Sequence, residues 1–352
     1  MDLIKRIHDA TYLFSQHSHL SEWVAGEACW WKTNKNDIYD SLKNPTMLLK
    51  ILESFGKGIE CSEIKVNPSV KSTGSSKNLF RIADGINCPK LHDYLENNPA
   101  EFNKTLQDVR NYFIENTTHI TEEQLEIQEC CEILGLKKND GKIVPPIFYK
   151  FGLLLNQIAT IHNNDNSEPK IALEIGAGYG GFPTLFTKHY KKCKYIIVDI
   201  QPTVSIAAFF LSKMGRSITL PHEFTSLDAF LKSTSDILFI YADQLNNIPN
   251  DSIDLVINMD SIVELNKPTI TFYIDNIKRI LKKNPNSFFI SNNMTYANYP
   301  HFIETCEDTF KGFGHVSQSS YGIPHTLLSF EFTMSDRYHI DIYHHIDTAL
   351  SV

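Results

Sequence analysis

A glycine-rich segment in the middle of the chain has the residue types and spacing of a ligand-binding turn. The apolar run from Ile171 to Ile175 contains one acid, Glu174, and glycines follow at positions 176, 178, 180 and 181. An apolar strand that ends in such a turn and leads into a helix is typical of the corner where α/β sheets bind phosphates or nucleotides. Glycine tolerates a positive φ, and its missing Cβ lets a ligand approach the backbone. The segment therefore predicts a nucleotide-like ligand at the end of this strand.

Two acids lie further along the chain, each at the end of an apolar run: Asp199 and Asp243. The pattern Gly-x-Gly-x-x-Gly, which begins at Gly176, matches the dinucleotide fingerprint, in which an acid about 20 residues downstream binds the ribose. The pattern Gly-x-Gly-x-Gly, which begins at the same residue and follows Glu174, is a second signature in the same segment. On spacing alone, a nicotinamide dinucleotide and another nucleoside cofactor both remain open.

The segment Leu-Glu-Ile-Gly-Ala-Gly-Tyr-Gly resembles motif I of class I S-adenosylmethionine-dependent methyltransferases. The resemblance implies S-adenosyl-L-methionine as the cofactor, with Asp199 at the ribose hydroxyls and Asp243 near the adenine amino group. It also implies that Glu174 accepts hydrogen bonds from loop amides or from the ammonium group of the cofactor. The implied cofactor-binding residues are Glu174, Gly176, Ala177, Gly178, Tyr179, Gly180, Asp199, Ile200, Asp243, Gln244 and Asn258.

Three aromatic residues are expected near the same ligand. Tyr179 and Phe182 are expected to pack over its methionine part, and Tyr149 is expected to close the pocket from above. Aromatic side chains combine a large apolar surface with a defined geometry, which suits them to line a binding site.

Residues 170–300 further resemble the sugar O-methyltransferase family. The shared features are the segment from Glu174 to Phe182, the helix that contains Ala-Ala-Phe-Phe-Leu, and the segment from Asn258 to Leu265. Gln201, inserted before Pro202, departs from the family pattern, and the N-terminal half resembles the family only loosely. The resemblance implies methylation of a hydroxyl group on a sugar, a glycan precursor or another small molecule. Another small-molecule or protein acceptor remains open, as does a catalytically silent cofactor-binding module.

A hydroxyl acceptor is a poor nucleophile, so a carboxylate or histidine that removes its proton would assist the transfer. Candidates follow the strands at their carboxyl ends. Asp260 and Glu264 follow the fourth expected strand, His301 begins the next helix, and His325 lies in the turn before the last strand. Asp260 could instead cap a helix, and His301 could lie on the surface. No acidic, histidine or cysteine cluster has the spacing of a metal site, so no metal is assigned.

Strands and helices alternate from residue 170 onward, which is typical of an α/β fold with a parallel sheet. Together with the resemblance, the pattern predicts a Rossmann-like, seven-stranded methyltransferase sheet that ends in an antiparallel hairpin formed by residues 315–321 and 326–334. A helix is expected at the C-terminus, around His344 and His345. Residues 145–352 are expected to form this cofactor-binding domain. Residues 1–144 are expected to form a mainly helical region for acceptor selectivity, a lid or oligomerisation, and a homo-oligomer remains open.

The composition restricts the class of protein further. A formal net charge of −8 argues against a broad nucleic-acid interface, because phosphate binding requires a basic surface. The seven cysteines form no CxxC pair, which favours reduced thiols over a disulfide framework. The N-terminal segment lacks the apolar core of a signal peptide, and no run approaches the roughly 18–20 apolar residues of a membrane span. These features predict a soluble, cytoplasmic protein.

Overall fold

The computed structural model describes residues 3–15, 110–134, 144–163, 168–259, 267–284, 286–294, 313–321 and 338–345, and the single positions 46, 48, 49, 52, 107, 261, 262 and 265. An eight-stranded sheet lies at the centre, with strand order β3-β4-β2-β1-β5-β6-β8-β7. The strands are β1 (Ile171–Ile175), β2 (Lys194–Val198), β3 (Ile218–Thr219), β4 (Ile237–Ile240), β5 (Leu255–Met259), β6 (Phe288–Met294), β7 (Phe313–Tyr321) and β8 (Tyr338–His345).

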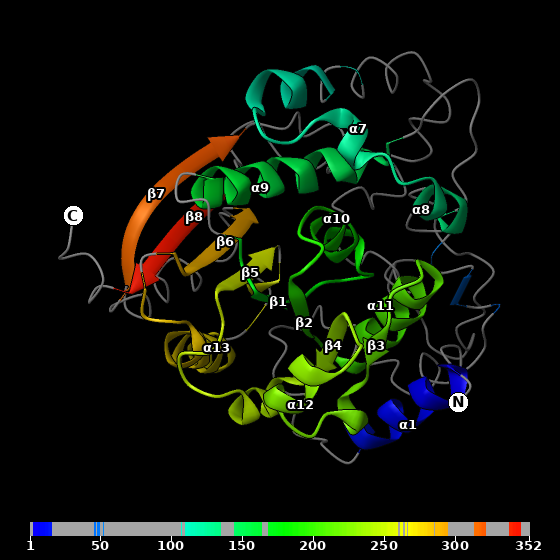
Figure 1. Ribbon diagram of the computed structural model, residues 1–352. Helices are drawn as coiled ribbons and strands as arrows, with labels where there is room; N and C mark the ends of the chain where they lie inside the picture. Colours follow the sequence, from blue (N-terminus) through cyan, green and yellow to red (C-terminus); the bar gives the residue numbers. More distant parts are fainter. Residues whose placement is uncertain are drawn as a thin grey trace, which may run out of the picture.

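Helices cover both faces of this sheet (Figure 1). The described helices are α1 (Leu3–Ser15), α7 (Glu122–Leu125), α8 (Gln128–Ile133), α9 (Pro146–Asn163), α10 (Gly181–His189), α11 (Gln201–Lys213), α12 (Leu227–Lys232) and α13 (Lys267–Ile280), with the 3-10 turns η3 (Pro221–Glu223) and η4 (Ala242–Asn247). Among the helices that the structure describes, none combines the length and the apolarity that crossing a membrane requires.

Six strands, from β3 to β6 in the sheet order, run parallel to one another. Strand β8 is antiparallel to both β6 and β7, so β7 runs in the same direction as β6. The central strands are short and almost wholly apolar because both faces of a parallel sheet are covered by helices. All five residues of β1 are buried, and this includes the one acid, Glu174.

The structure confirms the expected first strand. The apolar runs at 195–199, 236–243, 254–260 and 287–292, each expected to be a strand, correspond to β2, β4, β5 and β6, whose bounds differ from these by one to three residues. The expected count of seven strands is wrong, because the two-residue strand β3 pairs with β4 at the edge. The C-terminal helix is also wrong: His344 and His345 lie in β8 and pair with β7. The expected strand at 326–334 lies outside the described residues.

Two apolar layers hold the helices to the sheet. On one face, α9, α10 and α11 contribute Phe148, Phe186 and Phe210 to a core that also contains Ile7 and Ala10 of α1. On the other face, α12 and α13 pack against the alternate side chains of β1, β2 and β4. Helix α13 buries residues at positions 270, 273, 274, 277 and 280, the three- and four-residue spacing of one helical face.

The described part of residues 1–144 is mainly helical; α7 contacts α9 and α10, whereas α1 contacts α11 and η3. The side-chain oxygen of Asn156 in α9 accepts the backbone N–H groups of Thr118 and His119, at 3.0 and 2.9 Å. Lys188 in α10 donates to the carbonyl oxygens of Gln124 and Glu126, at 3.1 and 2.8 Å, and so satisfies acceptors at the end of α7.

Candidate functional site

The glycine turn leaves β1 at the carboxyl edge of the sheet. Gly176, Gly178 and Gly180 have φ values of 79°, 58° and 93°, in the left-handed region that favours glycine. The N–H of Gly176 donates to the carbonyl oxygen of Val198 at 2.9 Å, and the N–H of Gly180 donates to that of Ala177 at 3.1 Å. The turn therefore remains attached to β2 on one side and closes directly into α10 on the other.

Neighbouring protein atoms, rather than open space, surround two of these glycines. A Cβ at Gly176 would overlap the side chain of Ser261, and a Cβ at Gly180 would lie 3.0 Å from Leu211. The sequence suggested that the missing Cβ atoms make room for a ligand. At Gly176 the space is instead filled by Ser261, so the requirement for glycine there comes from the fold.

Asp199 joins this turn to the end of β2. Its Oδ1 accepts the N–H of Ile200 at 2.7 Å, and its Oδ2 accepts the N–H of Gly178 at 3.3 Å. Burial raises the pKa of Asp199 to about 7, although the hydrogen bonds from Ile200 and Gly178 act in the opposite direction. The side chain is partly exposed. The backbone N–H of Ala177 and the hydroxyl of Thr203 also donate to this carboxylate. A carboxylate has about four acceptor positions, so a ligand hydroxyl that bonds to Asp199 must share a position with one of these four donors or replace it.

Glu174 lies one strand away and is only 1% exposed. The hydroxyl of Tyr195 in β2 donates to its Oε2 at 2.8 Å. Burial raises the pKa of Glu174 to about 8; the bond from Tyr195 lowers it, and the charge of Asp199 raises it further. The described partner of Glu174 is therefore a tyrosine rather than a loop amide, the ammonium group of the cofactor stays an expected partner, and burial favours the neutral form of the carboxyl group.

Asp243 lies in η4, directly after β4, and is partly buried. Tyr273 of α13 lies within electrostatic range of both acids, since burial and then the charges of Asp199 and Asp243 raise its pKa above the usual range. The structure thus brings together two acids that are 44 positions apart and adds a buried tyrosine. Tyr273 is not among the site residues predicted from the sequence.

Asn258 and Gln244 have structural partners within the protein. The amide of Asn258 donates to the carbonyl oxygen of Ile175 at 2.9 Å and to the hydroxyl of Ser261, which itself donates to Ile175. The amide of Gln244 accepts the N–H of Tyr241 and donates to the carbonyl of Pro221, each at 2.9 Å. Both side chains therefore hold neighbouring turns, and their contact with a cofactor stays a prediction.

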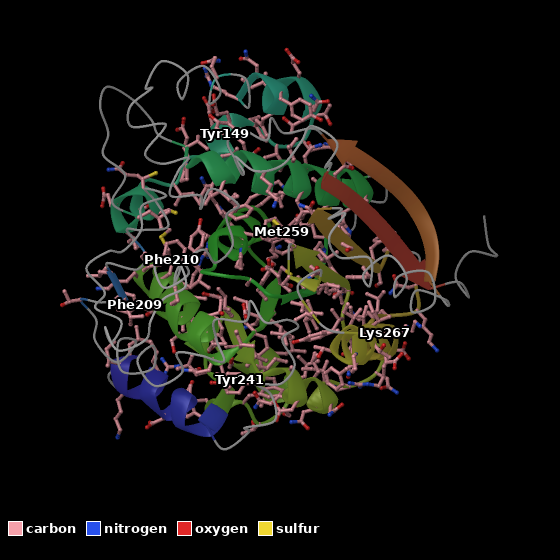
Figure 2. The ribbon with its side chains drawn as sticks, turned by 180° about the vertical axis from the view of Figure 1, so that it is seen from behind. Tyr149, Phe209, Phe210, Tyr241, Met259 and Lys267 are labelled. Carbon is pink, nitrogen blue, oxygen red and sulfur yellow. The ribbon has the colours of Figure 1, made fainter. Side chains whose placement is uncertain are left out.

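The three aromatic residues expected at the ligand also pack within the protein. The ring of Tyr179 is 1% exposed and lies 5.2 Å from that of Phe210, centroid to centroid. Phe182 packs against Phe151 in the same core. Tyr149, which Figure 2 shows on α9, donates its hydroxyl to Glu122 at 2.6 Å. The three rings are thus held by contacts within the protein, and their contact with a ligand stays a prediction.

The proposed bases Asp260, Glu264, His301 and His325 lie outside the described residues. At the described carboxyl edge, Met259 ends β5 and is in register with the fully buried Asn292 of β6. Among the residues that the structure describes, no group of three or more His, Cys, Asp or Glu side chains is placed to hold a metal ion.

Comparison with solved structures found chains of similar fold at low identity. One is a SAM dependent methyltransferase from Aquifex aeolicus (15% identity, 49% of this chain and 81% of that chain, TM-score 0.34). Another is the 1,6-didemethyltoxoflavin-N1-methyltransferase of Burkholderia thailandensis, crystallised with S-adenosylhomocysteine (12% identity, 53% and 76%, TM-score 0.35). A third is an O-methyltransferase family 2 protein from Planctomyces limnophilus in complex with apigenin (12% identity, 52% and 51%, TM-score 0.34). No protein-family model and no curated protein matched the chain.

Proposed function

We propose that the chain is an S-adenosylmethionine-dependent O-methyltransferase that methylates a hydroxyl group of a sugar or glycan precursor. One arrangement carries the cofactor assignment. Asp199 and Asp243 follow the adjacent strands β2 and β4, by one and three residues, beside a turn after β1 that contains three glycines of positive φ. Ligands of open α/β sheets bind outside the carboxyl ends of the strands, and all three segments lie at that edge.

The residues at this edge fit the chemistry of the cofactor. In the proposed site, Asp199 accepts the ribose hydroxyls, Asp243 lies toward the adenine, and the backbone of residues 176–180 faces the amino-acid part. The cofactor supplies a methyl group on a positively charged sulfur, which makes the methyl carbon electrophilic. Tyr195 keeps Glu174 in place under the turn, and the Asn258–Ser261 pair holds the carbonyl of Ile175 where the turn begins.

The remaining task of the protein is to align the acceptor and to receive its proton. Correct alignment of two reactants supplies a large part of the rate enhancement in such displacements. A general base within hydrogen-bond reach of the acceptor hydroxyl adds typically a further 10²–10⁴-fold, approximately. Asp260, Glu264, His301 and His325 are proposed for that role, and residues 1–144 are proposed to select the acceptor.

A hydroxyl acceptor is favoured over an amide or an exocyclic amine. The segment Asn258-Met-Asp-Ser lacks the Asn-Pro-Pro-Tyr pattern that is typical of amine and amide methylation. In addition, Asn258 is fully buried. Its side-chain nitrogen donates to the carbonyl oxygen of Ile175, and its side-chain oxygen accepts the N–H of Ile262. The side-chain oxygen, which an amine substrate would need as the acceptor of its N–H, is therefore already engaged by the N–H of Ile262.

Calorimetric titration with S-adenosylhomocysteine tests the cofactor assignment. We expect the wild type to bind, Asp199→Ala to bind at least about 30-fold more weakly, and Asp243→Asn about fivefold more weakly, because charge-assisted hydrogen bonds contribute about 1.5–3 kcal/mol each. Asp228→Asn, at an exposed position of α12, serves as the control. Absence of binding, unchanged affinity in both site variants, or binding of NAD instead would contradict the assignment.

Turnover tests the reaction. Labelled methyl transfer from S-adenosylmethionine to a panel of UDP-, GDP- and TDP-sugars is expected to give an alkali-stable methyl ether. Cofactor binding without transfer to any hydroxyl compound would support a catalytically silent binding module. Transfer to an amine would contradict the assignment as an O-methyltransferase but would agree with the assignment of the cofactor.

A further inference from the structure

A buried hydrogen-bonded group joins α1 to the two segments that carry the acids. Its centre is Tyr241, which lies between β4 and η4 and has no exposed surface. The hydroxyl of Tyr241 donates to the side-chain oxygen of Gln201 at 2.6 Å and lies 2.8 Å from the carbonyl oxygen of Ala10 in α1. Figure 2 shows Tyr241 beside α1.

Gln201 connects this tyrosine to the other acidic segment. It is the first residue of α11, two positions after Asp199, and it is also fully buried. Its amide nitrogen donates to the hydroxyl of Ser205 at 2.7 Å, which orients the oxygen toward Tyr241. Because Tyr241 lies two positions before Asp243, the Tyr241–Gln201 bond ties together the segments after β2 and β4 that carry the two acids.

A second contact holds α1 four residues before Ala10, at Arg6. Arg6 donates to both carboxylate oxygens of Glu223 in η3, at 2.6 and 2.7 Å, and to the carbonyl oxygen of Ile218 at 2.7 Å. Turn η3 is in turn bonded to η4, because Gln244 links the N–H of Tyr241 with the carbonyl of Pro221. On the same helix, Ile7 and Ala10 are 2% and 1% exposed and belong to the core cluster that contains the buried side chains of α11.

We propose that α1 is a strap that sets the separation of Asp199 and Asp243, with Tyr241 and Gln201 as positioning residues for the nucleoside end of the cofactor. The inference rests on the proposed function for the identity of that ligand. A nucleoside held by both acids stabilises the arrangement in which Tyr241 meets Gln201 and Ala10. The coupling is reciprocal. If the bound ligand increases the equilibrium constant for docking of α1 by a given factor, docking of α1 increases the affinity for the ligand by the same factor.

Hydrogen exchange on the full chain with S-adenosylhomocysteine tests the coupling. In the wild type, saturating S-adenosylhomocysteine is expected to slow amide exchange in residues 3–15 about tenfold, since exchange there reports the local opening of α1. Tyr241→Phe removes only the hydroxyl that both partners share. It is expected to raise the dissociation constant of S-adenosylhomocysteine about five- to tenfold and to abolish most of the protection of α1.

Arg6→Ala provides a second variant that leaves Tyr241 intact. We expect faster exchange in α1 without ligand and an about threefold weaker affinity. The swap Arg6→Glu with Glu223→Arg should restore both only in part, because it re-forms the ion pair but not the bonds to the carbonyl of Ile218 and from the N–H of Leu220. Lys5→Ala, at an exposed position of the same helix, is the matched control and should change neither. Absence of ligand binding to the wild type would overturn the proposed function and the coupling together. Binding with unchanged α1 exchange and unchanged affinity in Tyr241→Phe would overturn the coupling alone.

Discussion

Glu174 places a carboxyl group in a strand whose other four residues are apolar. An ionised carboxylate in such surroundings is strongly disfavoured unless it is paired, and the described partner is the neutral hydroxyl of Tyr195. The pKa of about 8 reflects this balance. The ionised Glu174 side chain thus lowers the free energy of unfolding as the pH approaches 8. The pH dependence of the free energy of unfolding measures the sign of this contribution.

Glu174→Gln tests this sign. In the unfolded chain the carboxyl ionises near pH 4.5, and in the folded protein near 8. The folded wild type therefore loses stability relative to the unfolded chain as pH rises from about 5 to 8, whereas glutamine does not titrate and still offers Tyr195 an acceptor. The free energy of unfolding of Glu174→Gln should exceed that of the wild type increasingly toward pH 8, by a few kcal/mol, since each pKa unit equals about 1.4 kcal/mol.

Urea unfolding at pH 5, 6.5 and 8 would measure this difference, with Asp228→Asn as the exposed control. A difference that is the same at all three pH values would show that the carboxyl group is not buried as described.

Two physical reasons can require glycine in the turn: a positive φ and the lack of space for a Cβ. Comparison of Gly176 with Gly215 distinguishes them. Gly176 and Gly215 have nearly the same φ, 79° and 75°, but a Cβ at Gly176 would overlap Ser261, whereas a Cβ at Gly215 meets nothing within 4 Å. Gly215→Ala should lower the free energy of unfolding by about 1 kcal/mol from the left-handed conformation alone. Gly176→Ala should lower it by about 3 kcal/mol or more, because overpacking adds to that cost. Equal losses in denaturant unfolding would contradict the contact with Ser261.

At the scale of elements, Asp254 aligns the beginnings of three strands. Its Oδ2 accepts the N–H groups of Lys170 and Ile171, at 3.0 and 2.9 Å, and its Oδ1 pairs with the ammonium group of Lys282 at 2.6 Å. Its own carbonyl accepts the N–H of Phe288, where β6 starts. One side chain therefore fixes the register of β1 relative to β5, and that register places the glycine turn beside Asn258.

Asp254→Ala is expected to lower the free energy of unfolding by about 2–3 kcal/mol, because it removes two hydrogen bonds to backbone N–H groups and one partly buried ion pair. Thermal unfolding followed by circular dichroism would measure the change. Asp228→Ala breaks an exposed pair with Lys232 on α12, and it should change stability by less than about 0.5 kcal/mol. Similar losses in the two variants would argue against the role of Asp254.

Element prediction succeeded where the apolar pattern was continuous and failed where the pattern was weak or misread. Strands β1, β2, β4 and β5 are buried on both faces, so each appears as an apolar run. Strand β3 has only two residues and carries almost no signal. In β8, Ile340 and Ile342 alternate with His339 and Asp341, which is typical of a strand with two different faces. That signal was present, but the segment was interpreted as a helix.

At the scale of the molecule, the N-terminal and C-terminal parts share one core. Ile7 and Phe113 belong to the same buried cluster as Phe186 and Tyr241. The expected division at residue 144 therefore separates segments that pack together in the described part of the chain. Two parts that share a core are expected to unfold together, because neither buries its apolar surface alone.

Scanning calorimetry of the full chain should then show one transition, with a calorimetric enthalpy close to the van't Hoff enthalpy. Tyr241→Phe and Arg6→Ala should shift that single transition to lower temperature by a few degrees without splitting it. Two separated transitions in the wild type would instead support independent domains on either side of residue 144.

The sequence by itself determined the α/β class, the glycine turn and the positions of Asp199 and Asp243, because strand burial and turn chemistry are local properties that residue types express directly. It could not determine which side chains at that edge face a ligand. Gln244 and Asn258 bind neighbouring backbone, Tyr179 enters the core, and Gly176 makes room for Ser261. Most of these contacts join residues more than 20 positions apart in the chain. Such contacts form only when the chain folds. The same is true of Ala10, which meets Tyr241 across 231 positions of the chain.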